Sequence, residues 1–457
     1  MANLLVGAAK VCIDPTADMY PIPGSRTDFG LPPMQYEEKY DDCNVRVIAI
    51  DNGKSRYLFM AFECGSVQGD ASFIPSASKA TGVPAENIFV VQTHNHTAPG
   101  THSPGNYGAQ DPEIEAWNEK FNAIVVNGGI SAAKKAIETL RPAKWGYGES
   151  QSYINTNRNL QTLGGYWTEA RNLGGYSDHT LAILKFVDLD GKLIAAFMNH
   201  ATHATCCYML KDADHKAKTS GNFTGIASTF VETHFGGGAV ALWCSGAAGD
   251  QNPILSHGLQ YEYPDGYTTQ IQYPDGVGYM QMEFMGRYHG ADCVRGIDAI
   301  HADSDFMEIS HAKESVWLKA RQQKVFDMSF IPKARGGGQG PRPAEYPYGT
   351  LPPLNQGPEM IPADPKELIL DTLTLGNVGM IFMNCELFAK LGRDVKAASP
   401  LKNTVIVTHH SGPRTGYIFD KESADIKVPM AYSGIVPGAS DDAIVDGVKK
   451  VFQKISG

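Results

Sequence analysis

The sequence lacks any apolar run near the roughly 20 residues that a membrane-spanning helix needs, and no positive charge precedes the short apolar stretch at its start. It also lacks a stretch rich in lysine or arginine, and its 49 acidic residues outnumber the 39 basic ones, for a formal net charge of −10. We therefore expect no transmembrane segment, no signal peptide and no nucleic-acid partner.

Cysteine is sparse, with eight residues in 457, no CxxC pair and no dense group. Such scattered thiols are typical of reduced cysteines, so we expect a cytoplasmic protein. Most of them stand in apolar surroundings, as in Leu242-Trp243-Cys244. We expect these to be buried structural thiols rather than nucleophiles or metal ligands.

Apolar residues make up 42% of the chain and charged residues 19%, which permits a large core and excludes a disordered protein. Runs typical of strands alternate with segments of helical spacing, and this alternation predicts an α/β protein. Strands are predicted at residues 45–50, 57–62, 88–91, 181–187, 193–198, 239–243, 378–383 and 404–407. Helices are predicted at residues 112–140, 225–234, 279–301, 387–398 and 440–455.

Two segments interrupt this alternation, at residues 253–278 and 332–362. Both are rich in proline and glycine, which excludes a regular helix or a central strand. They are predicted to be long loops, either plain surface loops or a lid that faces a substrate.

The predicted strand 88–91 leads into His94-Asn95-His96, so both histidines stand at its carboxyl end, where α/β folds place their sites. On a regular strand, residues i and i+2 lie on the same face of the sheet. A turn at this position would change how the two imidazoles are presented. We expect one histidine to be a metal ligand and the other to be available for proton transfer. A purely structural hydrogen-bonded pair is the alternative.

A second group follows the predicted strand 193–198, where His200 and His203 stand among small polar residues. Neutral imidazole is a favoured zinc ligand, and catalytic zinc has three protein ligands and an open position. Glu386, directly after the strand 378–383, is the candidate carboxylate. Stabilisation of Glu386 by a helix dipole is the alternative.

Two polar turns complete the candidates. Residues 245–253 form a small-residue segment that lets the backbone approach a ligand closely, and residues 155–159 contain Arg158 among asparagines. Each segment is equally compatible with an ordinary turn.

Taken in order, these segments resemble the catalytic domain of the neutral ceramidases. Residues 93–100 (THNHTAPG) are similar to the family's THTHSGPG, and residues 7–15 (GAAKVCIDP) to its opening Gly-x-Ala-Lys-x-Asp-Ile-Thr-Pro. Further similarity lies in residues 155–158, 201–205, 220–227, 249–253, 384–386 and 415–418. The resemblance therefore extends over almost the whole chain.

The resemblance implies one catalytic domain over residues 1–457, with mixed sheets flanked by helices and without the C-terminal β-sandwich domain of longer ceramidases. It implies that zinc is held by His94, His203, Glu386 and Tyr417. It implies that the candidate catalytic residues are His96, Arg158, Tyr432 and Asp250. Gly24 is expected to approach the metal from the N-terminal segment. Acidic residues are too widespread to assign ligands for a second metal such as Ca²⁺ or Mg²⁺.

The expected reaction is hydrolysis of an amide in a small-molecule or N-acyl substrate, with zinc activating a water and His96 accepting its proton. The family's Gly-Asp-Val-Ser-Pro serine is replaced here by Gln251 or Asn252. An esterase, lactonase or lyase for a small polar molecule is the second reading. A non-enzymatic binding protein with structural zinc is the third. A ceramidase-like site should be a long apolar groove, whereas a small-molecule site should be closed and polar.

Overall fold

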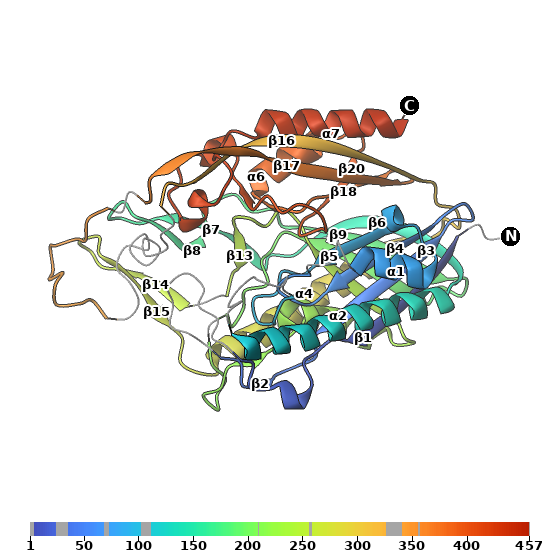
Figure 1. Cartoon of the computed structure of the whole chain (residues 1–457), viewed down its shortest axis with the longest axis horizontal. Coiled ribbons are helices and arrows are strands. Elements are labelled where there is room, and N and C mark those ends of the chain that lie inside the picture. Colours follow the sequence, from blue (N-terminus) through green and yellow to red (C-terminus); the bar gives the residue numbers. More distant parts are fainter. Residues whose placement is uncertain are drawn as a thin grey trace.

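The computed structural model describes residues 4–23, 35–67, 73–101, 111–208, 210–255, 258–325, 341–354 and 357–456. Gly24 and residues 332–340 and 355–356 of the predicted loop 332–362 lie outside these residues, and the end of that segment forms the start of a strand at Met360. The predicted α/β class is confirmed, because mixed sheets are flanked by helices (Figure 1).

The larger sheet has eight strands in the order β12-β10-β9-β6-β1-β3-β4-β5. Neighbouring strands are mostly antiparallel, but β4–β5 and β10–β12 are parallel pairs. The strands are β1 (Leu5–Cys12), β3 (Asn44–Asp51), β4 (Arg56–Phe62), β5 (Ile88–Gln92), β6 (Arg141–Gln151), β9 (Thr180–Asp188), β10 (Leu193–His200) and β12 (Val240–Ser245).

A second sheet of four strands follows the order β16-β17-β18-β20. Its strands are β16 (Ile309–Gln323), β17 (Met360–Leu375), β18 (Val378–Phe382) and β20 (Asn403–Val407). Smaller sheets pair β2 (Glu38–Lys39) with β11 (Lys218–Thr219), β7 (Asn155–Gln161) with β8 (Trp167–Asn172) and β13 (Gln251–Pro253), β14 (Gly258–Glu262) with β15 (Thr268–Gln272), and β19 (Glu386–Leu387) with β21 (Tyr417–Ile418).

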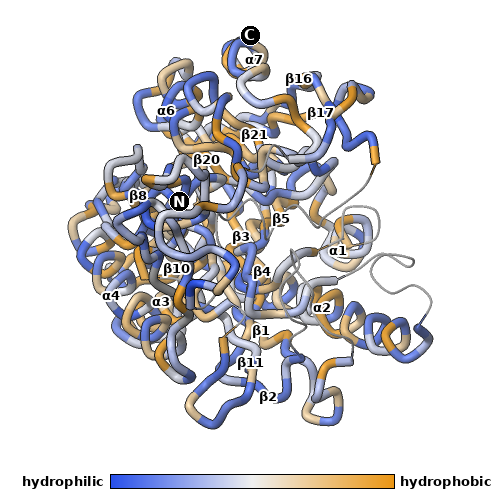
Figure 2. Tube along the Cα trace, turned by 90° about the vertical axis from the view of Figure 1, so that its left-hand side faces the viewer, coloured by the Kyte–Doolittle hydropathy of each residue, from blue (hydrophilic) through white to orange (hydrophobic). Residues whose placement is uncertain are grey.

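The two main sheets pack face to face, and helices cover the outer face of each (Figures 1 and 2). Phe59 and Phe197 of the large sheet meet Phe382 and Val407 of the small one in a single apolar cluster. The large sheet is covered by α1 (Phe73–Thr81), α2 (Pro112–Glu138), α3 (Asn222–Phe235) and α4 (Val277–Ala299). The small sheet is covered by α6 (Ala389–Ala398) and α7 (Asp441–Ser456). Short 3₁₀ turns occur at Ala17–Met19, Ala85–Asn87, Lys421–Ser423 and Pro429–Tyr432.

All predicted strands and helices are present, but several strands were missed. β1 and β6 are long strands in which small, polar or charged residues interrupt the apolar run. Residues 155–161 form the strand β7 rather than only a polar turn. The segment 253–278 contains the surface hairpin β14–β15, so it is not a plain loop.

The expectations about membrane-spanning helices and about the cysteines can be compared with the structure. Of the helices described, none combines the length and the apolar composition that crossing a bilayer requires. All eight cysteines are free, and all but Cys12 are buried, which confirms the interpretation as buried thiols.

Replacement of Phe382 by Ala tests whether the interface between the two sheets holds the fold together. Its ring is fully buried and lies 4.8 Å from that of Phe89 and 6.1 Å from that of Phe59, measured between centroids. We expect the free energy of unfolding to fall by about 3–5 kcal/mol, because a large cavity remains. Chemical denaturation measures the loss. Phe284→Ala, at a side chain 59% exposed, is the control, and equal losses in both variants would contradict the prediction.

Candidate metal centre

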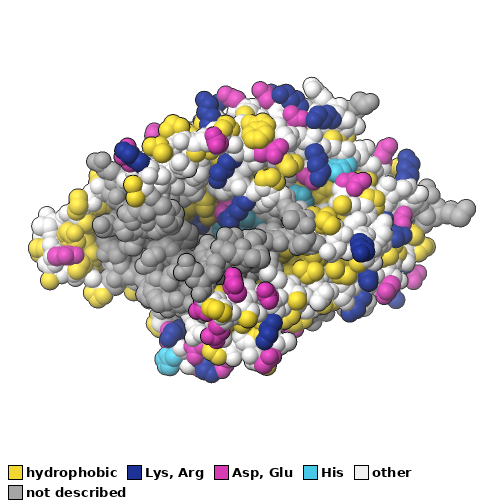
Figure 3. Space-filling model, in the orientation of Figure 1, with side chains coloured by type: hydrophobic (Ala, Val, Ile, Leu, Met, Phe, Trp, Pro, Cys, Tyr) yellow, Lys and Arg dark blue, Asp and Glu magenta, His cyan; other side chains and the backbone are white. Residues whose placement is uncertain are grey.

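The predicted site residues come together at one end of the two packed sheets. His94 follows β5, His203 follows β10 and Glu386 follows β18, each within four residues of the strand end. β5 and β10 belong to the large sheet and β18 to the small one, so packing of the sheets brings the three segments together. Figure 3 shows histidine and basic side chains next to each other near the middle of one face.

A turn at His94 determines how the two histidines of the first motif are presented. β5 ends at Gln92, and His94 has a φ of 53°, in the left-handed region that non-glycine residues rarely adopt. The chain therefore does not continue as a strand. The imidazole nitrogens of His94, His96 and His203 lie within 4.8 Å of one another. Both histidines thus face one centre, and three imidazoles are available as ligands.

The contact between His203 and Glu386 brings two potential metal ligands together. Nδ1–H of His203 donates to the carbonyl oxygen of Gln251 at 3.1 Å, an arrangement that leaves the lone pair on Nε2. Burial, followed by the nearby Arg158, lowers the pKa of His203 to about 4, so its imidazole is neutral. Nε2 nevertheless lies 3.1 Å from Oε2 of Glu386. His203 and Glu386 thus direct a ring nitrogen and a carboxylate oxygen at the same point, as two ligands of one metal ion would.

Glu386 is ionised despite its burial. Burial raises the pKa of the carboxyl, but the neighbouring His94 and His203 lower it by a larger amount. The pKa of Glu386 therefore lies well below its usual value. Oε2 is 3.6 Å from Nε2 of His94, and Oε1 accepts a hydrogen bond from Nη2 of Arg414 at 2.8 Å. The negative charge is therefore directed at the imidazoles on one side and at a guanidinium on the other.

Tyr417 and Arg158 form the next part of the site. In the register of β19 and β21, Tyr417 lies directly beside Glu386. The guanidinium carbon of Arg158 is 5.5 Å from the centre of the Tyr417 ring. Burial, followed by the charge of Glu386, raises the pKa of the Tyr417 phenol. Burial alone would lower the pKa of Arg158, but Tyr417 and Glu169 raise it above its ordinary value, so Arg158 stays charged.

Buried polar atoms without a hydrogen-bond partner gather beside these residues. Within the described ranges, they include Oγ1 of Thr93, Oγ1 of Thr202, Nε of Arg158 and Oε1 of Gln251. Thr93 and Thr202 directly precede His94 and His203 in the chain. Because buried polar groups are normally paired, this grouping is typical of a place that an ion, water or substrate occupies. The imidazole, carboxylate and phenol donors are suited to zinc.

The structure places the remaining predicted residues around this centre. Both carboxylate oxygens of Asp250 accept 2.8 Å hydrogen bonds, one from the Ala389 amide and one from Asn157. Asp250 thus connects α6 to β7 instead of contacting the imidazoles. Tyr432 packs against the same apolar cluster as Tyr417. Gly24 lies outside the described residues.

Two residues of the centre were missed by the sequence analysis. The ring of His409 stacks on that of His94, with centroids 4.0 Å apart and planes 11° apart. Arg414 contacts Glu386 as described above. His409 and His410 directly follow the small polar residue after β20, the same strand-end pattern that identified His94 and His203. That pattern could have found His409, whereas nothing in the sequence marks Arg414.

A second group of potential ligands, formed by Cys12, Asp14 and Asp42, is less suited to a metal. The ammonium of Lys39 lies 3.2 Å from Oδ2 of Asp14 and 2.6 Å from Oδ1 of Asp42. A side-chain cation therefore already neutralises this group.

Gly249→Ala tests whether the close approach of Gly249, in the turn after β12, to the backbone of Glu386 positions this candidate metal ligand. A Cβ at Gly249 would overlap the carbonyl oxygen of Glu386, and the Gly249 carbonyl accepts a 2.8 Å hydrogen bond from Arg158. We expect metal affinity to fall roughly 10- to 100-fold, as for loss of an outer-shell partner. Metal analysis after dialysis measures it. Gly174→Ala, where the nearest atom is 3.8 Å from the added Cβ, should retain metal, and equal retention in both variants would refute the prediction.

Comparison with known proteins identifies the fold. No family model matches the chain. A neutral ceramidase of Pseudomonas aeruginosa is 30% identical over 174 residues, which cover 35% of this chain and 25% of that protein. The aligned part thus spans a quarter of the length of that relative.

Two solved structures resemble the whole chain. The crystal structure of neutral ceramidase from Pseudomonas aeruginosa matches with a TM-score of 0.68 at 17% identity, covering 100% of this chain and 75% of that one. A ceramidase complexed with C2 matches with a TM-score of 0.69 at 16% identity, covering 100% of this chain and 76% of the other. The chain therefore has the fold of these neutral ceramidase structures.

Proposed function

We propose that this protein is a zinc-dependent hydrolase that cleaves an amide bond of an N-acyl substrate. The observation that carries the proposal is the grouping of the His94, His96 and His203 imidazoles, with Nε2 of His203 3.1 Å from Oε2 of Glu386. The likeness to neutral ceramidases supports the choice of bond. The test is metal analysis followed by a screen of N-acyl amides, esters and lactones with zinc-loaded protein.

The proposed ligands are His94, His203, Glu386 and Tyr417. When bound there, zinc would polarise the substrate carbonyl and lower the pKa of a water to roughly 7. The carboxylate of Glu386 neutralises part of the positive charge, and its hydrogen bond from Arg414 fixes the direction in which Oε2 points. The stacked ring of His409 keeps His94 in its orientation.

His96 is the proposed proton carrier. Its imidazole is within 4.8 Å of those of His94 and His203, so one of its nitrogens can reach a water held at the centre. It accepts the proton of the attacking water and then donates it to the leaving amine. His96 belongs to the group of three imidazoles, so its use as a third ligand is the competing assignment.

Arg158 and Tyr432 are the proposed stabilisers of the oxyanion. Arg158 is buried and charged, and its guanidinium is held by the Gly249 carbonyl at 2.8 Å and by Glu169 at 3.1 Å. A fixed donor in a site shielded from water stabilises developing negative charge more effectively than a mobile one. Tyr432 would provide its phenol from the cluster that it shares with Tyr417.

An esterase, lactonase or lyase for a polar molecule is the second candidate, with the same metal site and a different bond. It is favoured by a cavity lined largely by polar side chains, which includes Glu169 and Asn252, two partners of Arg158. Purely structural zinc is the third reading. Zinc-loaded protein without turnover of any class in the screen would overturn the hydrolase proposal and leave the structural reading.

His203→Ala tests the metal centre itself. Loss of this imidazole removes a ligand and leaves the Glu386 carboxylate without its neighbour, so we expect zinc affinity to fall by roughly 100-fold or more, beyond the loss of an outer-shell partner. Competition with a chromophoric chelator measures the affinity. His234→Ala, at an exposed histidine of α3, is the control. Unchanged affinity in His203→Ala would exclude His203 as a ligand.

His96→Ala separates proton transfer from metal binding. We expect zinc to stay bound while kcat falls by about 100- to 10,000-fold, the usual contribution of a general acid–base group. Metal content and kcat are measured on the same preparation. If zinc is lost together with activity, His96 is a ligand; if activity persists, it is not the base.

A further inference from the structure

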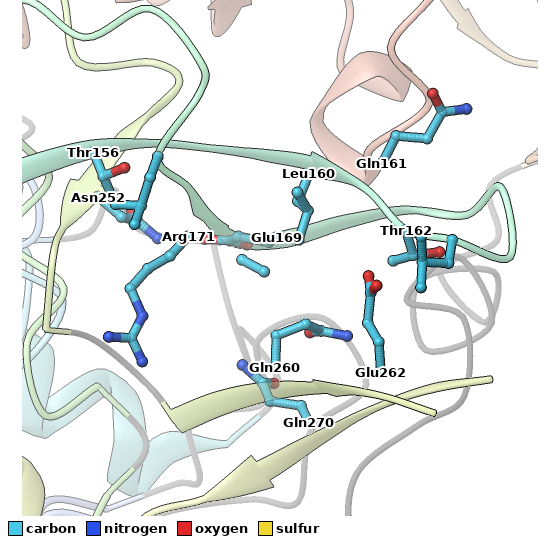
Figure 4. A pocket seen from close by; sticks show the side chains of 13 residues that line it. Thr156, Leu160, Gln161, Thr162, Glu169, Arg171, Asn252, Gln260, Glu262 and Gln270 are labelled. Atoms are coloured by element: carbon cyan, nitrogen blue, oxygen red, sulfur yellow. Dashed lines mark hydrogen bonds between the residues drawn. The ribbon is translucent and has the colours of Figure 1, made fainter. Parts of the chain in front are cut away.

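A cavity of about 530 Å³ lies between the β7–β8 strands and the β14–β15 hairpin (Figure 4). Its volume is within the roughly 300–1,000 Å³ typical of small-molecule sites. Gln260, Glu262 and Gln270 come from the hairpin, and Glu169 and Asn252 come from the opposite side. Most of the lining side chains carry amide, carboxylate or hydroxyl groups.

This cavity shares a wall with the metal centre. Asn252 accepts a 3.3 Å hydrogen bond from Nη1 of Arg158 and donates one of 2.9 Å to Glu169. The preceding residue, Gln251, accepts the hydrogen bond from His203. Successive residues of β13 therefore contact a proposed metal ligand and line the cavity. The cavity therefore lies directly beside the Arg158 and Asn252 side chains that adjoin the imidazoles.

The hairpin turns its polar residues toward the cavity. In its register, Gln260 lies directly opposite Gln270, and Glu262 is two residues further along the same face. Tyr261 and Ile271 alternate with them, and each exposes 47% of its surface. A sheet with one covered face normally directs apolar residues inward and polar residues outward. This hairpin does the reverse at these positions, so its polar groups are presented to the occupant of the cavity.

The amide of Gln260 gives an independent indication of such an occupant. Its Nε2 atom is buried and has no hydrogen-bond partner within the described part of the chain. An unpaired buried donor costs about 1–3 kcal/mol. A ligand that accepts a hydrogen bond at this position would remove that cost.

We propose that the cavity binds a polyhydroxylated group, such as a sugar or a sugar alcohol, as the part of the substrate beyond the scissile bond. Hydroxyl groups both donate and accept hydrogen bonds, and they match the amide groups of Gln260, Gln270 and Asn252. An alkyl chain would instead desolvate these groups without replacing their hydrogen bonds. The assignment to a substrate rests on the proposed hydrolase function, whereas binding of the group does not.

Calorimetric titration of the whole protein tests the proposal without any need for turnover. Methyl α-D-glucopyranoside represents a ring sugar and sorbitol an open-chain polyol. We expect at least one of the two to bind, and we expect Gln260→Leu and Gln270→Leu each to weaken binding by about tenfold or more, since an apolar group then faces the hydroxyls. Gln322→Leu, at an exposed glutamine of β16, should bind as the unaltered protein does.

Circular dichroism and the Tm of each variant establish that it is folded, and Glu262→Gln replaces any variant that is not. Absence of binding to both probes would overturn the proposal. Binding that the cavity variants leave unchanged would also overturn it. Binding of N-octyl acetamide instead of the two polar probes would overturn it as well, because the cavity would then accept an alkyl chain. Sugar binding together with failure of the amide screen would remove the hydrolase function and leave the binding site.

Discussion

The site depends on the approach of a neutral imidazole to a buried carboxylate. His203 and Glu386 come from loops that follow strands of different sheets, and their facing atoms are 3.1 Å apart. Burying an ionised carboxylate is expensive unless other charges and hydrogen bonds compensate it. Arg414 compensates one oxygen of Glu386, and the other oxygen faces the imidazoles of His94 and His203. The packing of the two sheets maintains this arrangement, because it fixes both strand ends.

Much of the fold could be predicted from the sequence, because central strands such as β5, β10 and β18 are continuous apolar runs. Strands with mixed surfaces could not. β7 contains Asn155, Arg158 and other polar residues, and they are buried next to the candidate metal centre. Periodicity cannot separate such a strand from a turn, since its polar residues are compensated by partners far away in the chain.

The candidate site was predictable where histidines follow an apolar strand, and less so where the geometry depends on the backbone. The left-handed conformation of His94 brings His96 to the same centre, although residue spacing alone leaves their relation open. The contact of Arg414 with Glu386 depends on the path of the segment before β21. These features arise from tertiary contacts, which no local pattern encodes.

Arg158 connects the reaction centre to substrate selection. One edge of its guanidinium contacts the Gly249 carbonyl near the metal site, and the other contacts Glu169 and Asn252 in the cavity wall. Fold similarity to ceramidases therefore does not determine the substrate, because the scaffold positions the metal while nearby side chains select what extends past Arg158. A long acyl chain requires an apolar path, but amide and carboxylate side chains, most of them partly buried, line this cavity together with three leucines. The proposed hydrolytic centre would thus act on a polar molecule where the residues beside Arg158 favour hydrogen bonding over apolar contact.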